Sequence, residues 1–132
     1  MSMNNSPTLT VRFSIPPKSL WPNARDNWRK RSAEKRAYRD SCVLIVRERL
    51  EGRDLRLKRC RIVSSWVFRT NRRRDADYRS GALKSAFDAL KLAGAIADDD
   101  LTRVEHGHPH VLVVPDSMSE YVVLNIFEVH DE

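Results

Sequence analysis

The pattern of apolar and polar residues predicts four extended segments. Residues 8–15 alternate apolar and polar side chains as a β-strand does, and Pro16-Pro17 ends the segment. Further extended segments are predicted over residues 57–69, about 104–114 and about 120–129. The turn residues Pro115-Asp116-Ser117 separate the last two segments, so we expect these two to form a hairpin.

Helical periodicity is found in two other stretches. The first covers residues 32–51, with Ser32 as its N-cap and Gly52 at its end. The second covers residues 79–93 and ends at Gly94. The order β-α-β-α-β-β predicts an α+β fold in which two main helices pack on a mixed β-sheet.

Length and composition favour a cytoplasmic, single-domain protein with no membrane partner. The domain is expected to span residues 1–132, with residues 1–7 flexible. No apolar run approaches the roughly 18 residues of a membrane span, and the opening MSMNNSPT lacks the apolar core of a secretory signal. Cys42 and Cys60 are expected to be buried, reduced thiols rather than a disulfide or a metal site.

The charge is unevenly distributed along the chain. Residues 1–79 carry 21 Lys and Arg against 8 Asp and Glu, a net charge of +13. Residues 80–132 carry 3 against 10, a net charge of −7. A basic half joined to an acidic half indicates a surface for a polyanion beside a group that holds cations, although a solvated helix face would give the same counts.

Five aspartates flank the second predicted helix. Asp75 and Asp77 are two residues apart, so their carboxylates share one face of an extended segment. The run 98–100 would meet them if the chain returns after Gly94 beside the strand that ends near Arg74. Carboxylate oxygens suit Mg²⁺ or Mn²⁺, and such an ion can activate water and stabilise charge on a phosphodiester. A capping or surface role is the alternative for this pair.

Lys84 adds a base to the same region. Asp77, Gly81, Lys84 and Asp88 have helical spacing, so one helical stripe would carry acid and base together. An ammonium group near a phosphate could stabilise the transition state of phosphoryl transfer. The alternative is an ion pair between Lys84 and Asp88.

These motifs resemble the RusA family of crossover-junction endodeoxyribonucleases. The most specific likeness is R-R-R-D-A-D, then A-L-K-S-A-F-D-A-L-K-L-A-G, then D-D-D, in order and near the family spacing. Near the N-terminus, I-P-P, P-N-A-R, W-R and S-A-E-K-R-A-Y-R-D are similar to the family's opening strand, loop and first helix. The likeness covers nearly the whole chain.

The resemblance implies a homodimer that acts in DNA recombination and repair by binding four-way (Holliday) junctions and cutting paired strands. It implies Mg²⁺, or Mn²⁺, held by Asp75, Asp77 and Asp99, with Asp98 and Asp100 as neighbours of the third ligand, and it makes Lys84 the active-site lysine. Tyr78 stands where the family usually has Asn. A catalytically impaired junction-binding protein of the same fold is therefore the alternative.

Two basic clusters are the candidates for DNA contact. Arg72, Arg73 and Arg74 adjoin the proposed metal site and could hold phosphates. The second cluster consists of Asn23, Arg25, Arg29, Lys30 and Arg31. Trp21 and Trp28, which lie among them, would either stack on an unpaired base or pack in the core.

The histidines of HGHPH have strand spacing. On one continuous strand His106, His108 and His110 would share a face and could bind a transition metal. No further soft ligand lies close in the sequence, so we interpret them as surface residues.

Overall fold

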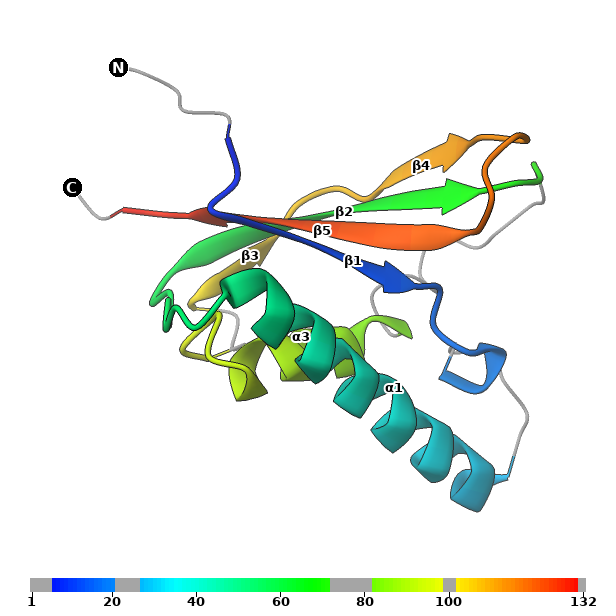
Figure 1. Cartoon of the computed structure of the whole chain (residues 1–132), viewed down its shortest axis with the longest axis horizontal. Helices are drawn as coiled ribbons and strands as arrows, with labels where there is room; N and C mark the ends of the chain where they lie inside the picture. Colours follow the sequence, from blue (N-terminus) through cyan, green and yellow to red (C-terminus); the bar gives the residue numbers. More distant parts are fainter. Residues whose placement is uncertain (1–5, 21–26, 72–81, 99–101, 131–132) are drawn as a thin grey trace.

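A computed structural model of the chain describes residues 6–20, 27–71, 82–98 and 102–130. These residues form a single α+β domain, as predicted, in which two α-helices lie against one face of a five-stranded mixed sheet (Figure 1). The elements are β1 (Leu9–Ser14), the 3-10 helix η1 (Lys18–Leu20), α1 (Trp28–Leu50), β2 (Cys60–Phe68), α3 (Lys84–Leu92), β3 (Val104–His106), β4 (His110–Val113) and β5 (Tyr121–Glu128).

The sheet is organised around β5 and β2, which lie at its centre. β5 is antiparallel to both of its neighbours: Ile126 lies opposite Leu9 of β1 and opposite Ile62 of β2. β3 and β4 are both parallel to β2 and lie along its other side. The predicted turn exists, because the Ser117 N–H donates to the Val114 carbonyl (3.0 Å). The predicted hairpin is wrong, since β2 lies between β4 and β5.

β3 and β4 are one strand position interrupted by Gly107-His108-Pro109. Val104 lies opposite Cys60, whereas His110 lies opposite Ser65, so the offset between paired residues changes from 44 to 45. One extra residue is therefore accommodated at the break, as in a β-bulge. A Cβ atom at Gly107 would lie only 2.8 Å from Cγ2 of Val63, so the break needs glycine.

The interruption separates the histidines. The ring of His106 lies 4.7 Å from that of Phe87 in α3, on the helical side of the sheet. His110, opposite Ser65, lines a hollow on the other side with Arg61. The three histidines are exposed, as interpreted, but the prediction of a shared face is wrong because the extra residue reverses the alternation. In the ranges that the structure describes, no three His, Cys, Asp or Glu residues are grouped to hold a metal.

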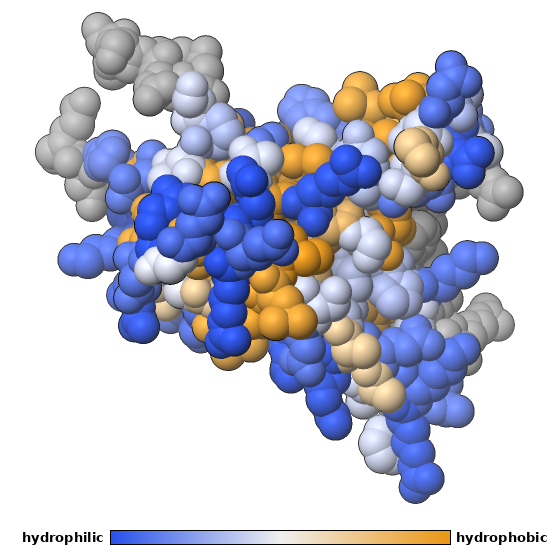
Figure 2. Space-filling view, in the orientation of Figure 1, coloured by the Kyte–Doolittle hydropathy of each residue, from blue (hydrophilic) through white to orange (hydrophobic). Residues whose placement is uncertain are grey.

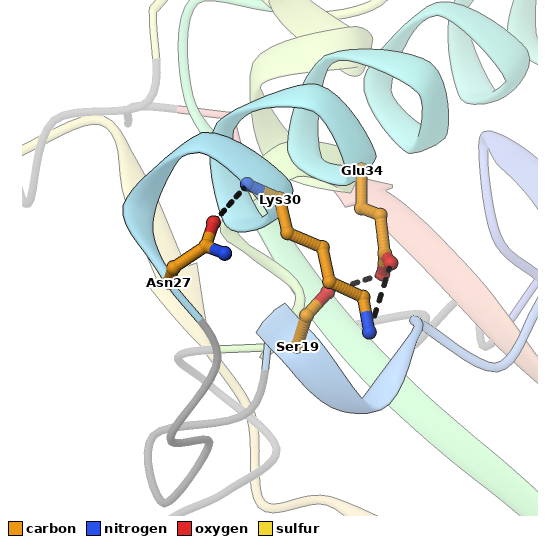
Figure 3. A network of polar contacts seen from close by, with 4 residues as sticks. All are labelled: Ser19, Asn27, Lys30 and Glu34. Carbon is orange, nitrogen blue, oxygen red and sulfur yellow. Dashed lines mark hydrogen bonds and ion pairs between the residues drawn. The ribbon is translucent and has the colours of Figure 1, made fainter.

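α1 begins earlier than predicted. Asn27, not Ser32, is the N-cap: its Oδ1 accepts a hydrogen bond from the Lys30 backbone N–H (2.8 Å; Figure 3). The helix ends as expected, with Gly52 in a left-handed conformation (φ 82°). Although α1 has 23 residues, it carries eight Lys or Arg. None of the helices in the described ranges is both long and apolar enough to cross a membrane.

α3 begins later than predicted. Its first residue is Lys84, and Leu83 before it has a non-helical backbone (φ −87°, ψ 0°). The helix ends at Leu92, with Gly94 (φ 85°) after it as predicted. Of the predicted acid–base stripe, Lys84 and Asp88 both lie in α3, whereas Asp77 and Gly81 lie outside the described residues.

The core lies between the sheet and the two helices. The inward face of β2 carries Cys60, Ile62, Trp66 and Phe68, which are all buried. Trp66 is fully buried; its ring stacks on Phe68, with 6.0 Å between centroids, and its indole N–H donates to Ser64 Oγ (3.1 Å). These contacts fix β2 against the helices that carry the candidate site.

Both cysteines are free and buried, as predicted. Burial raises the pKa of the Cys42 thiol to about 12 and that of the Cys60 thiol to about 11. The reactive thiolate is thus scarce at pH 8, and we expect native protein to react with a thiol reagent at least about 100-fold more slowly than an ordinary cysteine. The measurement is the rate of DTNB labelling, with urea-unfolded protein as the control in which both thiols react. Rapid labelling of one thiol in the native protein would contradict its buried position.

Candidate nucleic-acid interface

The structure describes four of the twelve predicted site residues: Arg29, Lys30, Arg31 and Lys84. The others lie outside the described residues, namely Asn23, Arg25, Arg72, Arg73, Arg74, Asp75, Asp77 and Asp99. Trp21, Tyr78 and Asp100 lie outside them as well. The described part of the candidate interface consists of the first turns of α1 and α3.

A groove of about 360 Å³ lies where α1 and α3 begin, beside η1. It is lined by Leu20, Trp28, Arg31, Ser32, Lys35, Lys84 and Ser85. Two predicted site residues far apart in the sequence, Arg31 and Lys84, are thus brought together. Lys35 completes a set of three cations, and none of the described lining residues is acidic. Sequence reasoning missed Lys35, although it follows Arg31 by four residues and so shares its helix face.

The backbone adds to the positive potential of the groove. Lys84 is the first residue of α3, and no side chain caps the N-terminus of that helix. Neither α1 nor α3 has an acidic residue in its first turn. Within their described first turns, no carboxylate therefore neutralises the positive end of either helix dipole, and such an end favours an anion.

The positive charges in the first turn of α1 destabilise that helix. Arg29, Lys30 and Arg31 lie at its positive end, where each cation is unfavourable by about 0.3–1 kcal/mol. A bound phosphate would remove this repulsion. The arrangement is thus better explained by anion binding than by helix stability.

Trp28 is a surface residue. Its side chain is 71% exposed, so core packing is wrong for this tryptophan. The Arg29 guanidinium lies 5.4 Å from the Trp28 ring centroid and orients the indole. An exposed indole that lines a cationic groove can stack on a nucleic-acid base while the cations hold its phosphate.

A small polar network fixes η1 against α1. The buried hydroxyl of Ser19 donates to a carboxylate oxygen of Glu34, and Lys30 Nζ lies 4.0 Å from the other oxygen (Figure 3). Glu34 points toward Ser19 and Lys30 and does not line the groove. The Lys30–Glu34 pair is partly exposed and contributes little to stability, so Lys30 can exchange it for a phosphate.

The surroundings of Lys84 differ from the expectation in two ways. The anticipated ion pair with Asp88 is not formed within the described residues, and Lys84 is exposed. The chain does return after Gly94 beside the predicted strand over 57–69, but it pairs with the start of that segment: Leu57 and Ile96 form a parallel bridge, and the Ala97 N–H donates to the Leu57 carbonyl (2.9 Å).

Asp98, the described member of the acidic run, lies at the far end of α3 from Lys84. Its Oδ1 is 3.5 Å from Nζ of Lys91, in the last turn of the helix. A helix of nine residues is about 13 Å long. The described residue next to Asp99 is therefore separated from the groove by the length of α3.

Charge removal from the groove gives a direct test of its role. We expect Arg31→Ala with Lys35→Ala to weaken binding to labelled four-way junction DNA, and to lower the slope of log affinity against log salt by about 2. The measurement is fluorescence anisotropy over a salt series. Arg47→Ala with Arg56→Ala removes two exposed cations away from the groove and should leave the slope close to that of the wild type. Equal slopes for the two double variants would show that the groove is not the DNA contact.

No protein-family model matches the sequence, and no curated protein matches it. The likeness to the RusA family rests on the motifs quoted above. What the described residues offer chemically is phosphate binding with a stacking surface beside it. They contain no grouped carboxylates that could hold a metal, so such a site would use the aspartates outside these ranges.

Proposed function

We propose that the chain is a metal-dependent, structure-selective DNA endonuclease that resolves four-way junctions by paired phosphodiester hydrolysis, as a homodimer. The observation that carries the proposal is the groove between the starts of α1 and α3. There Lys84, Arg31 and Lys35 converge with the exposed Trp28. Three cations, two helix N-termini without acidic residues in their first turns and a stacking ring are the chemistry by which proteins hold a nucleic-acid backbone and an unpaired base.

Each group in the proposal has a defined task. Arg31 and Lys35 bind phosphates that flank the cut, and Lys84 donates hydrogen bonds to the phosphate that gains charge during hydrolysis. Asp75, Asp77 and Asp99 are proposed to hold Mg²⁺, or Mn²⁺, because three carboxylates are a donor set that these ions prefer. When bound, the ion would supply Lewis-acid stabilisation of the same phosphate.

A second candidate is a junction-binding protein with impaired catalysis. It is favoured by the position of Asp98, which is ion-paired to Lys91 at the opposite end of α3 from Lys84. Tyr78, in place of the family's usual Asn, favours the same reading. The groove would serve both functions, so binding alone does not distinguish them.

The test is cleavage of a synthetic four-way junction beside a linear duplex of the same sequence, with Mg²⁺, Mn²⁺ or EDTA. Paired, metal-dependent nicks in the junction alone are the expected result. Tight junction binding without nicks in either metal would replace the nuclease by the binding protein. Equal, weak binding of junction and duplex would contradict both.

A further inference from the structure

The two edges of the sheet are treated differently. At the β1 edge, side chains of α1 donate to strand carbonyls: Arg49 Nε to Thr10 O (3.1 Å) and the Tyr38 hydroxyl to Ser14 O (2.6 Å). At the other edge, β4 pairs only with β2, and none of the hydrogen bonds of the described side chains reaches the β4 backbone. One edge is thus closed by its own helix, whereas no described strand or side chain closes the other.

The open edge is also apolar. Val111, Leu112, Val113 and Val114 are 42%, 52%, 41% and 39% exposed, and Figure 2 shows hydrophobic surface over β4. Natural proteins protect such an edge with charged side chains, lysine above all. Here no Lys or Arg occurs anywhere in residues 104–132, although the chain has 24. An exposed, apolar and uncharged strand of this kind is typical of a surface that another strand or chain covers.

The backbone of β4 shows which groups are free. The Val114 N–H donates to the Phe68 carbonyl in β2 (2.8 Å). In a parallel pair, alternate residues direct both backbone groups to opposite sides. The N–H and C=O groups of Val111 and Val113 therefore point away from β2 and pair with none of the described strands.

We infer that a second copy of this chain covers β4, by antiparallel β4–β4 pairing about a twofold axis at Leu112. This inference rests on the homodimer of the proposed function and names its surface. With that axis, Val111 of each copy lies opposite Val113 of the other, and these residues exchange all their free backbone groups. Leu112 lies opposite itself, so the exposed leucines pack together at the centre.

The ionisable residues at the two ends of β4 favour antiparallel pairing with a second copy of the chain. His108 and His110 lie at its start, and Asp116 and Glu120 follow its end. Antiparallel pairing brings the histidine end of one copy to the acidic end of the other, whereas parallel pairing would place like groups together. DNA is disfavoured as the occupant because residues 104–132, which contain β4 and the segments that flank it, have carboxylates and no Lys or Arg to hold phosphate. None of the described residues lining the groove belongs to β4, so the groove stays available.

The first test measures the mass of the full chain by sedimentation equilibrium over a concentration series. We expect a dimer for the wild type, and Leu112→Lys should raise the dissociation constant at least about tenfold, because two like charges then meet on the axis. Leu44→Lys is the matched control, since Leu44 is a 67% exposed leucine on α1, and it should dimerise as the wild type does. A wild type that stays monomeric, or a Leu112→Lys variant that still dimerises fully, overturns the inference.

The second test addresses the register. Residues directly opposite each other in a non-hydrogen-bonded antiparallel pair have Cα atoms about 4.5 Å apart, within reach of a disulfide. Leu112→Cys should therefore form a covalent dimer on mild oxidation, whereas Val114→Cys, two residues from the axis, should not. The buried Cys42 and Cys60 do not interfere. Crosslinking of Val114→Cys alone would contradict the axis at Leu112. Both tests measure the association of two chains and not DNA cleavage. A negative cleavage assay would therefore leave the β4 inference untouched, and a failed β4 test would leave the cleavage result untouched.

Discussion

Asp77→Asn is expected to abolish cleavage of a four-way junction while junction binding stays the same or becomes tighter. The substitution removes a proposed metal ligand and also a negative charge that repels DNA. Replacing groups that only support metal ligands commonly lowers activity or metal affinity by about 10–100-fold, so losing a ligand should lower the cleavage rate by more than about 100-fold. The measurements are single-turnover cleavage with Mg²⁺ and anisotropy binding with EDTA.

Two further variants sharpen this result. Asp98→Asn is the matched control, because the structure pairs Asp98 with Lys91, and it should cleave nearly as the wild type does. Asp99→Asn should be as inactive as Asp77→Asn if that segment supplies the third ligand. Should Asp77→Asn lose binding and folding stability together with cleavage, Asp77 would have a structural role and the metal site would need other ligands.

Trp66→Ala is expected to lower the free energy of unfolding by about 3–5 kcal/mol. The side chain is fully buried and stacked on Phe68, so its removal leaves a cavity beneath the centre of the sheet. The Ser64 hydroxyl also loses the indole N–H that donates to it. Since a domain of this size is stable by only about 5–15 kcal/mol, the variant is expected to be close to unfolding at 37 °C. Urea denaturation followed by circular dichroism measures the change.

Trp28→Ala is the matched control for this experiment. Trp28 is 71% exposed, and its removal should alter unfolding by no more than about 0.5 kcal/mol. It should nevertheless weaken binding to junction DNA by about 1–3 kcal/mol, the usual contribution of a stacked base. If Trp66→Ala proved harmless and Trp28→Ala strongly destabilising, the assignment of the two tryptophans to core and surface would be reversed.

The sequence predicts those parts of the fold that depend on local periodicity. β1, β2 and β5 lie within their expected segments, because apolar residues at every second position have one buried side to face. The starts of the helices are less predictable: Asn27 and Ser32 are both acceptable N-caps, and only packing selects Asn27. The end of α1 is easier to predict than its start, because Gly52 follows the helix and glycine adopts the left-handed conformation readily.

The wrong predictions concern features that depend on contacts between segments far apart in the sequence. HGHPHVLVV reads as one strand, but pairing to β2 requires an extra residue at Gly107-His108-Pro109, and sequence alternation does not reveal it. The hairpin was predicted because the segments are adjacent in the chain, yet β2, from an earlier part of the chain, pairs with both β4 and β5 and lies between them. At the candidate site, the charge pattern indicated Arg31 and Lys84, but only the packing of α1 on α3 shows that Lys35 joins them.

The position of β5 also fixes the order in which the molecule can assemble during synthesis. β1 and β2 both pair with β5, which consists of residues 121–128. Leu9 can therefore pair with Ile126 only after a further 117 residues have been synthesised. Until β5 has left the ribosome, these two strands have no neighbour between them, and their apolar faces depend on the helices or on chaperones for cover. Sheet formation is therefore a late event governed by long-range contacts, which fold slowly. If a ribosome stalls before residue 121, the nascent chain lacks β5, and β1 cannot be joined to β2 in the sheet.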